Sequence, residues 1–287
     1  MSLSSTLLSN PTAFFETYGR DFRNPILIEK TLAILRDPTC SAQSLVKMLE
    51  KEPGVSSKVL KTANSAFFGA PRSISSLKAA IVRVGNQNIA RLALAAALTP
   101  KPSPLWAAFW RHSIAVAMLS RHMARFLKVY GPIEQEEFFT MGLLHDLGAL
   151  IMLMSGEYPA VEAQLNAHPL TLDEAERRVF GFDHTELGRV IAERWSFPSD
   201  LVNAIAHHHN PEAAGDFYPR VAVIHLADLI AQGFRFGIHP RELPPPTKEE
   251  YLQELHIPVE QLVLFGEWLV SNRAEIESFG DLLSLAE

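Results

Sequence analysis

The chain has 287 residues, of which 47% are hydrophobic and 20% charged, and its formal net charge at pH 7 is -6 with a pI near 6.0. This composition is ordinary for a soluble globular protein, and the acidic balance excludes nucleic acid and an anionic membrane as expected partners. The single cysteine, Cys40, excludes an internal disulfide and suits a reducing cytosol, so we expect a cytoplasmic protein. The first ten residues lack a secretory pattern, and the apolar run 92–98 is far shorter than the ~20 residues that span a bilayer. The opening Met-Ser-Leu also fits an expression leader on part of a longer protein.

Helical periodicity dominates the chain, whereas alternating strand patterns are scarce and no Asn-Gly or Asp-Gly hairpin signal occurs. We therefore predict an all-α fold in three segments: an N-terminal helical half (11–104), a second helical half (105–238), and a linker with a C-terminal helical extension (239–287). Prolines at 100, 102 and 104 mark the first boundary, and the stretch HPRELPPPTKEE marks the second.

Two features of the N-terminal half predict local structure. Ser41 is a candidate N-cap of a short helix, and Pro53 is a candidate stop for it. The segment ANSAFFG (63–69) predicts a turn at the end of the following helix. We expect this turn to pack between the two halves, with Phe67 buried and Asn64 bonded to nearby backbone groups.

An unusual pair of polar residues stands in the stretch MGLLHDLGALIMLM, which runs from Met141 to Met154. Asp146 is the only charged residue between Phe138 and Gly156, and His145 precedes it. A helix that is apolar on every face is a buried helix. A carboxylate in such a helix is costly unless another group pairs with it. The pair therefore predicts a buried functional or structural site.

A long helix is predicted from Leu105 to Val129, and its apolar stripe contains His112. His122 in the same helix shares its face with Arg111 and Arg125. Such a face is typical of a solvated surface, so we assign no function to His122.

A further helix is predicted to open at Asp183, which together with Glu186 fits a capping box. His184 shares a face with Leu187 and Ile191 and so looks inward. A helix N-terminus disfavours a protonated imidazole, so we expect His184 to be neutral, as a metal ligand must be.

Two later helices continue this pattern. In SDLVNAIAHHHNP, His208 and His209 lie on two adjacent inward rows, whereas His207 follows the polar side. In VAVIHLADLIA, Asp228 is the only charged residue and lies on the apolar face, and His225 is a weaker candidate beside it.

Histidine and carboxylate side chains on separate inward faces are the ligand types that suit iron, manganese or zinc. A bridging carboxylate with several histidines could hold one or two such divalent ions and activate water for hydrolysis. The alternative is that each residue is a hydrogen-bonded polar group of the core, which is the better interpretation of any single one. Both interpretations stay open for the whole set. The candidate metal ligands are His112, His145, Asp146, His184, His208, His209 and Asp228.

The order H…HD…H…HH…D resembles the HD superfamily of metal-dependent phosphohydrolases, and most closely its HDOD (HD-related output domain) branch in bacterial signalling proteins. The resemblance covers roughly residues 25–231 and extends well beyond the HD pair. Similar blocks occur in the family's order, namely LRDPTCSAQSLVKMLEKEPGVSSKVLKTANSAFFG, ISSLKAAIVRVGNQNIARLAL, WRHSIAVAMLSRHMA, GLLHDLGAL, FGFDHTELGRVIAERWSFP and AIAHHHNP.

The resemblance implies that the N-terminal helical half packs on an HD-type helical half. It also implies that the seven candidate ligands occupy the superfamily's metal positions. Family members commonly follow a receiver or other sensory domain and act as output modules, mostly through protein contacts. The resemblance thus implies a protein partner or an upstream sensory domain, and a place for this chain as the C-terminal part of a response regulator.

Two departures concern catalysis. Cyclic-di-GMP phosphodiesterases of the related HD-GYP type usually have Lys where this chain has Ala149. They also follow the paired histidines with Glu and a Gly-Tyr-Pro segment, where this chain has Asn210-Pro211. Both departures argue against cyclic-di-GMP hydrolysis, and no catalytic residue is assigned.

Three functions therefore compete. The first is a signalling output domain that is not primarily an enzyme, and the second is a metal-dependent phosphohydrolase acting on a nucleotide or phosphodiester. The third is a DNA-binding module, because AAIVRVGNQNIARLAL has the spacing of a helix-turn-helix. The acidic net charge and the few Lys and Arg residues in that segment argue against the third.

Overall fold

The computed structural model describes residues 10–19, 25–37, 40–64, 74–98 and 104–284. Within these ranges every regular element is a helix, and the single β-bridge joins Thr171 to Leu243, so the predicted all-α class is confirmed. The chain forms two compact units, which we call unit 1 (residues 1–20 and 112–272) and unit 2 (residues 21–111 and 273–287).

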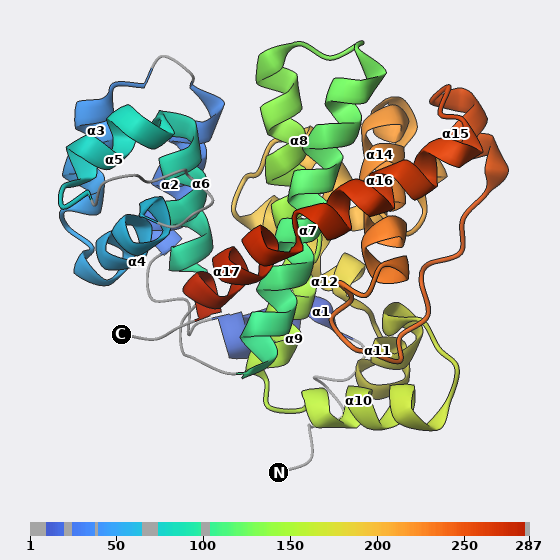
Figure 1. Ribbon diagram of the computed structural model, residues 1–287. Helices are drawn as coiled ribbons and strands as arrows, with labels where there is room; N and C mark the ends of the chain where they lie inside the picture. Colours follow the sequence, from blue (N-terminus) through green and yellow to red (C-terminus); the bar gives the residue numbers. More distant parts are fainter. Residues whose placement is uncertain (1–9, 20–24, 38–39, 65–73, 99–103, 285–287) are drawn as a thin grey trace. The chain divides into compact units, whose positions relative to one another are not determined.

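Unit 2 is built around α6 (Asn86–Ala97), against which four earlier helices pack (Figure 1). These are α2 (Pro25–Arg36), α3 (Ala42–Leu49), α4 (Pro53–Ala63) and α5 (Leu77–Val84), and α17 (Arg273–Ser284) packs on α4. Residues 89–96 of α6 are all buried. A recognition helix must present an exposed face to DNA, so the burial of α6 favours a core role for this segment.

Local signals in unit 2 account for its helix ends. The Ser41 hydroxyl accepts a hydrogen bond from the backbone N–H of Ser44 at 3.2 Å, which confirms the predicted N-cap. Pro53 was expected to stop this helix, but α3 already ends at Leu49. Pro53 instead occupies the first turn of α4, where its missing N–H costs nothing.

Asn64 closes the C-terminal end of α4. Its side-chain amide donates to the carbonyls of Leu60 (2.9 Å) and Ile74 (2.8 Å), and its oxygen accepts from the N–H of Ile74 at 2.6 Å. The expected bonding of Asn64 to backbone is therefore confirmed. Phe67 lies outside the described residues, as does the rest of the turn.

Unit 1 holds most of the remaining helices around a buried α9. Its elements are α1 (Pro11–Tyr18), α8 (Pro132–Leu144), α9 (Leu147–Met154), α10 (Tyr158–Ala167), α11 (Leu172–Phe180), α12 (His184–Arg194), α13 (Ser199–His207), the 3₁₀ helix η3 (Pro211–Phe217), α14 (Tyr218–Gly233), α15 (Glu249–Glu254) and α16 (Val259–Ser271). The predicted long helix is α7 (Pro104–Leu127), and the boundary between the two units falls within it.

The close crossing of α9 and α12 depends on two glycines. A side chain at Gly148 would overlap the carbonyl of His184, and one at Gly188 would lie 3.3 Å from the backbone nitrogen of Gly148. Residues 147–153 of α9 are all buried. This crossing brings the start of α12 against the start of α9, where the candidate ligands lie.

One stretch of the described chain, Glu134–Met154, is long and apolar enough to pass as a membrane span. It is 83% buried inside the protein, which is typical of a core helix of a globular domain.

Candidate metal centre

His145 and Asp146 lie at a break between two helices rather than inside one. The sequence predicted a continuous helix over this stretch, but α8 ends at Leu144 and α9 begins at Leu147. Asp146 has φ -95° and ψ 25°, outside the helical region. Consecutive side chains of a regular helix diverge by about 100°. The break instead places His145 Nε2 only 3.3 Å from Asp146 Oδ2.

One group of ligand atoms forms where α7 and α14 meet this break. His112 Nε2 lies 3.2 Å from His145 Nε2, 3.2 Å from Asp146 Oδ2 and 3.3 Å from Asp228 Oδ1. His145 Nε2 lies 4.0 Å from the same oxygen of Asp228. All four residues are buried.

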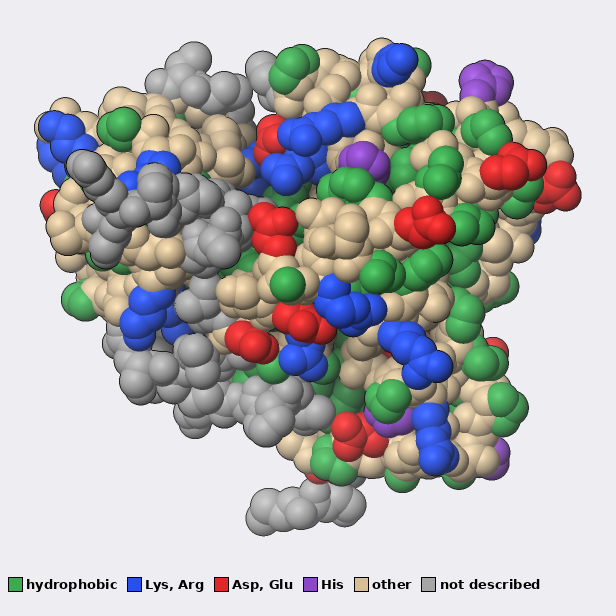
Figure 2. Space-filling view, in the orientation of Figure 1, with side chains coloured by type: hydrophobic (Ala, Val, Ile, Leu, Met, Phe, Trp, Pro, Cys, Tyr) green, Lys and Arg blue, Asp and Glu red, His purple; other side chains and the backbone are tan. Residues whose placement is uncertain are grey.

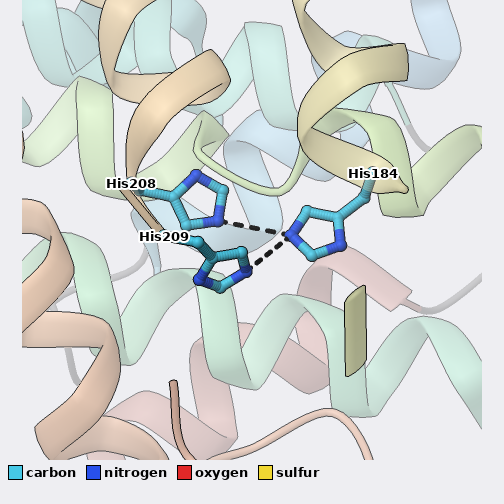
Figure 3. Close-up of side chains that lie close together, drawn as sticks. All are labelled: His184, His208 and His209. Atoms are coloured by element: carbon cyan, nitrogen blue, oxygen red, sulfur yellow. Dashed lines mark hydrogen bonds between the residues drawn. The ribbon is translucent and has the colours of Figure 1, made fainter. Parts of the chain in front are cut away.

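A second group forms on the other oxygen of Asp146. His184 Nε2 lies 3.3 Å from His208 Nε2 and 3.0 Å from His209 Nε2, and Figure 3 shows the three rings converging. Asp146 Oδ1 lies 3.4 Å from the Nε2 atoms of both His184 and His208. Asp146 thus joins the two groups, and the structure brings all seven predicted ligands into one cluster within unit 1.

The far nitrogen of four imidazoles is anchored as a donor. The Nδ1–H of His112 donates to the carbonyl of Phe236 (2.9 Å), and that of His145 to the carbonyl of Gly142 (2.8 Å). The Nδ1–H of His184 donates to Glu176 Oε2 (2.6 Å), and that of His208 to the carbonyls of Ala204 and Ile205 (3.2 and 3.1 Å). Such bonds fix the tautomer and leave the Nε2 lone pair for a cation.

This tautomer makes the centre unstable without a positive charge inside it. With Nδ1 donating, the Nε2 lone pairs of His112 and His145 face each other across 3.2 Å, and those of His184 and His208 across 3.3 Å. Lone pairs repel unless a proton or a metal ion lies between them. Bonds of about 2.0–2.1 Å to a metal separate neighbouring ligand atoms by about 2.9–3.4 Å. The observed spacings therefore fit metal ligands.

Two buried atoms at the cluster reinforce this fit. Asp228 Oδ2 and His209 Nδ1 have no hydrogen-bond partner among the described residues and lie 4.0 Å apart. Buried polar atoms normally have a hydrogen-bond or metal partner, so these two atoms indicate that a further group, such as a metal ion, binds at the centre.

The electrostatics of Asp146 and of two histidines suit cation binding. Burial alone would raise the pKa of Asp146, but His145, His184 and His112 hold that pKa well below its usual range. Burial lowers the pKa of His208, and burial together with His208 and His184 lowers that of His209 well below its usual range. Asp146 is therefore charged and these histidines are neutral, as ligands require.

The protonation state of His184 differs from the predicted one. Burial opposes its charge, but Glu176 and Asp146 raise its pKa well above the usual range, so the helix N-terminus does not keep it neutral. Each carboxylate carries a full charge, whereas the N-terminal end of a helix is equivalent to about half a charge. Asp146 and Asp228 raise the pKa of His112 in the same way. Each of these imidazoles must lose its Nε2 proton before it can bind a cation.

Glu176 on α11 is a site residue that the sequence interpretation missed. It is fully buried, and one carboxylate oxygen accepts from both the ring and the backbone N–H of His184. Leu172, Glu176 and Phe180 follow helical spacing on one buried row. The periodicity that points to the histidines therefore points to Glu176 as well.

The remaining histidines lie outside the cluster. His122 was expected on a solvated face, but its ring stacks on Trp268 of α16 at 4.1 Å, so α16 covers that face. His225 donates from Nδ1 to the carbonyl of His208 at 2.7 Å and supports the turn that carries His208 and His209. His207 is half-buried and contributes no ligand atom to the cluster.

Residues 236–245, which we call the strap, lie beside the cluster. The cavity there has a volume of about 10 Å³ and is lined by five of the seven ligands, by the start of α11, and by Ile238, Glu242, Leu243 and Pro245 of the strap. Such a volume holds about one water molecule. The Leu243 N–H donates to the carbonyl of Leu170 at 3.0 Å, which ties the strap to the start of α11. The strap thus forms one wall of the cavity and narrows access to the centre.

Glu242 organises the strap from within. Its carboxylate accepts from the backbone N–H groups of Ile238 (2.9 Å) and His239 (3.1 Å). Burial raises the pKa of Glu242 to about 7, against the opposing effect of His112.

A family model of the HDOD domain matches residues 23–211, and the chain therefore belongs to the HDOD domain family. A solved HDOD domain protein from Geobacter sulfurreducens has a TM-score of 0.70 at 25% identity, covering 90% of this chain and 91% of that one. A candidate phosphohydrolase from Shewanella amazonensis SB2B has a TM-score of 0.69 at 25% identity, covering 94% and 98%. A candidate signal transduction protein from Marinobacter aquaeolei VT8 shares the fold, with a TM-score of 0.72 at 20% identity over 90% of this chain and 59% of that one.

Curated relatives are longer than the matched region. An uncharacterised protein of Treponema pallidum (strain Nichols) is 25% identical over 235 residues, which are 77% of this chain and 44% of that protein. Ribonuclease Y of Thermus thermophilus is 31% identical over 145 residues, which are 50% of this chain and 19% of that protein. The match therefore spans less than half of each relative.

Proposed function

We propose that this HDOD domain is a cytoplasmic signalling output module that acts through protein contacts and retains a divalent metal centre. The observation that carries the proposal is the combination of a buried cluster of His and Asp side chains with a narrow cavity of about 10 Å³. A cluster with inward Nε2 atoms supports metal binding. The narrow cavity and the strap beside it leave little room for a nucleotide in this arrangement, which supports a role other than turnover.

Asp146 would be shared between two sets of ligands in such a centre. One ion would be held by His112, His145, Asp146 and Asp228, and a second by His184, His208, His209 and Asp146. Imidazole and carboxylate ligands suit iron, manganese or zinc. When bound, such ions supply a Lewis acid and an acidified water. In this chain the same residues would join α7, the α8–α9 break, α12, the end of α13 and α14, so metal would stabilise the arrangement of helices in unit 1.

Hydrolysis of a phosphodiester or nucleotide is the second candidate. The bridging position of Asp146 favours it, because two ions sharing a carboxylate are typical of hydrolytic centres. The names of the Shewanella relative and of ribonuclease Y also denote hydrolases. Against it stand the strap beside the cavity, and Ala149 and Asn210-Pro211, which differ from the residues usual in related cyclic-di-GMP phosphodiesterases.

A receiver or sensory domain is the partner that we propose for this module. The Treponema relative and the Marinobacter protein both extend beyond the matched region. Additional length in relatives supports an arrangement in which an attached domain passes a signal to the HDOD domain.

The test is a hydrolysis assay on the full chain after loading with Mn²⁺ or Fe²⁺. Substrates are bis(p-nitrophenyl) phosphate, cyclic di-GMP and a short RNA, and the matched control is Asp146→Asn, which removes the bridging charge and preserves shape. We expect turnover of the wild-type chain to be no higher than that of the variant. Metal-dependent turnover that the variant loses would instead establish the phosphohydrolase.

A further inference from the structure

Positive charge is concentrated in one part of this acidic chain. Unit 2 (residues 21–111 and 273–287) contains 14 Lys and Arg against 9 Asp and Glu, a net charge of +5 within a chain of net charge -6. Figure 2 shows Lys and Arg side chains on the surface over α3, α4 and α5 of unit 2. A local field of one sign attracts partners of the other sign.

A groove in unit 2 combines this charge with an apolar floor. It lies between α2 and α3, both of which pack on α6, and it has a volume of about 270 Å³. Leu27 and Met48 form its apolar part, and the exposed side chains of Lys30, Lys47 and Lys51 surround them. Among the described residues none of these three lysines forms an ion pair.

Among the described residues that line the groove, Glu52 is the one acidic side chain beside three cationic ones. Its volume is slightly below the ~300–1,000 Å³ of pockets that enclose drug-sized ligands. One or two apolar side chains fill such a volume. Met48 suits this use, because an unbranched thioether side chain adapts to different apolar partners.

We propose that the groove binds an acidic amphipathic segment of a partner protein, whose apolar residues contact Leu27 and Met48 and whose carboxylates pair with Lys30, Lys47 and Lys51. The proposal rests on the proposed signalling role, because an output domain that works by contacts needs a partner surface. Helix-in-groove recognition uses this combination of apolar anchors and charged flanks.

The lining disfavours nucleic acid as the occupant. Recognition of single strands uses aromatic side chains for base stacking, and base-edge readout commonly uses the fork of an arginine. The described residues that line the groove include neither an aromatic residue nor an arginine. A buried apolar contact such as Leu27 suits a peptide side chain better than a phosphodiester backbone.

Fluorescence anisotropy of the full chain tests the proposal. The probe is a labelled helical peptide with two leucines at i and i+4 flanked by glutamates, and its matched control replaces each glutamate with glutamine. We expect the acidic peptide to bind, with an affinity that falls as salt is added. The triple variant Lys30→Gln, Lys47→Gln, Lys51→Gln should bind it about tenfold or more weakly. Met48→Gln, which leaves the charges in place, should weaken binding as well.

A second triple variant separates the groove from general attraction. Lys61→Gln, Lys78→Gln, Arg83→Gln removes the same charge from exposed positions of unit 2 outside the groove, and we expect less than a twofold effect. Equal losses in both triple variants, or no binding of the acidic peptide, would overturn the proposal. Tighter binding of a labelled single-stranded oligonucleotide that the groove variant loses would overturn the proposal in favour of nucleic acid. Salt-sensitive self-association that the groove variant loses would overturn it in favour of a second copy of the chain. The hydrolysis assay uses residues of unit 1, so its outcome and this one are independent.

Discussion

The carboxylate of Glu176 holds His184 at two points: one oxygen accepts from the backbone N–H at 2.9 Å and from the ring Nδ1–H at 2.6 Å. This fixes both the start of α12 and the orientation of the imidazole. A carboxylate behind a metal-binding histidine also raises the basicity of the ligand. Glu176 is therefore a positioning residue of the proposed centre.

Replacing Glu176 with Gln should weaken metal binding by about 10–100-fold, because the amide can accept the ring proton but carries no charge. The measurement is the Kd for Mn²⁺ by calorimetry. In the metal-free chain, the pKa of His184 should also fall, since Glu176 is the leading cause that raises it. Glu193→Gln, an exposed change on α12, is the control. An unchanged Kd and an unchanged His184 titration would remove Glu176 from the site.

Replacing Asp146 with Ala should destabilise the chain by roughly 3–5 kcal/mol, because it removes the buried charge that four histidines contact. Urea denaturation in the presence of a chelator measures this loss without a metal contribution. Asp216→Ala, at an exposed position, should change stability by less than about 0.5 kcal/mol. A loss below about 1 kcal/mol for Asp146→Ala would show that the carboxylate does not neutralise the cluster.

The close crossing of α9 and α12 can be tested with a methyl group. Gly148→Ala should cost at least about 1–3 kcal/mol, because its Cβ would overlap the carbonyl of His184 and lie 2.7 Å from the backbone nitrogen of Gly188. Gly233→Ala near the end of α14 meets nothing within 4 Å and should be neutral or stabilise by up to about 1 kcal/mol. Equal effects of the two changes on the thermal midpoint would contradict the described packing.

Periodicity predicted what could be read from one helix at a time. It identified the inward faces of His112, His184 and Asp228, because a lone polar residue in an apolar stripe is visible in a single segment. It did not reveal the break at His145 and Asp146, since no proline and no Asn-Gly or Asp-Gly turn signal stands in this stretch. The pairing of Glu176 with His184 and the position of the strap depend on tertiary contacts, which a helical pattern does not specify.

The buried carboxyl of Glu242 should make the metal-free chain less stable as the pH rises. Its folded-state pKa of about 7 is above the ordinary 4.5, so the folded state binds this proton more tightly than the unfolded state. The stabilisation is complete below about pH 4.5 and is lost as the pH rises through 7, by roughly 3 kcal/mol in all. Glutamine resembles the protonated acid, so Glu242→Gln should remove this contribution.

Urea denaturation at pH 5 and pH 8 in the presence of a chelator measures the effect of Glu242. The difference in unfolding free energy between the two pH values should shift by roughly 3 kcal/mol in Glu242→Gln relative to wild type. Glu249→Gln, at an exposed position, should leave the difference unchanged. An identical pH dependence in wild type and Glu242→Gln would show that this carboxyl titrates normally.

The central claim is that the seven-residue cluster is a metal centre, and the metal content of the protein tests it most directly. The full chain, purified without chelator, is analysed by mass spectrometry for iron, manganese and zinc beside a folded Asp146→Asn variant. We expect one or two ions per wild-type chain and a large loss in the variant. A wild-type chain that stays metal-free, even after incubation with Mn²⁺ or Fe²⁺, would contradict the account and leave the cluster as a set of protonated and hydrogen-bonded core residues.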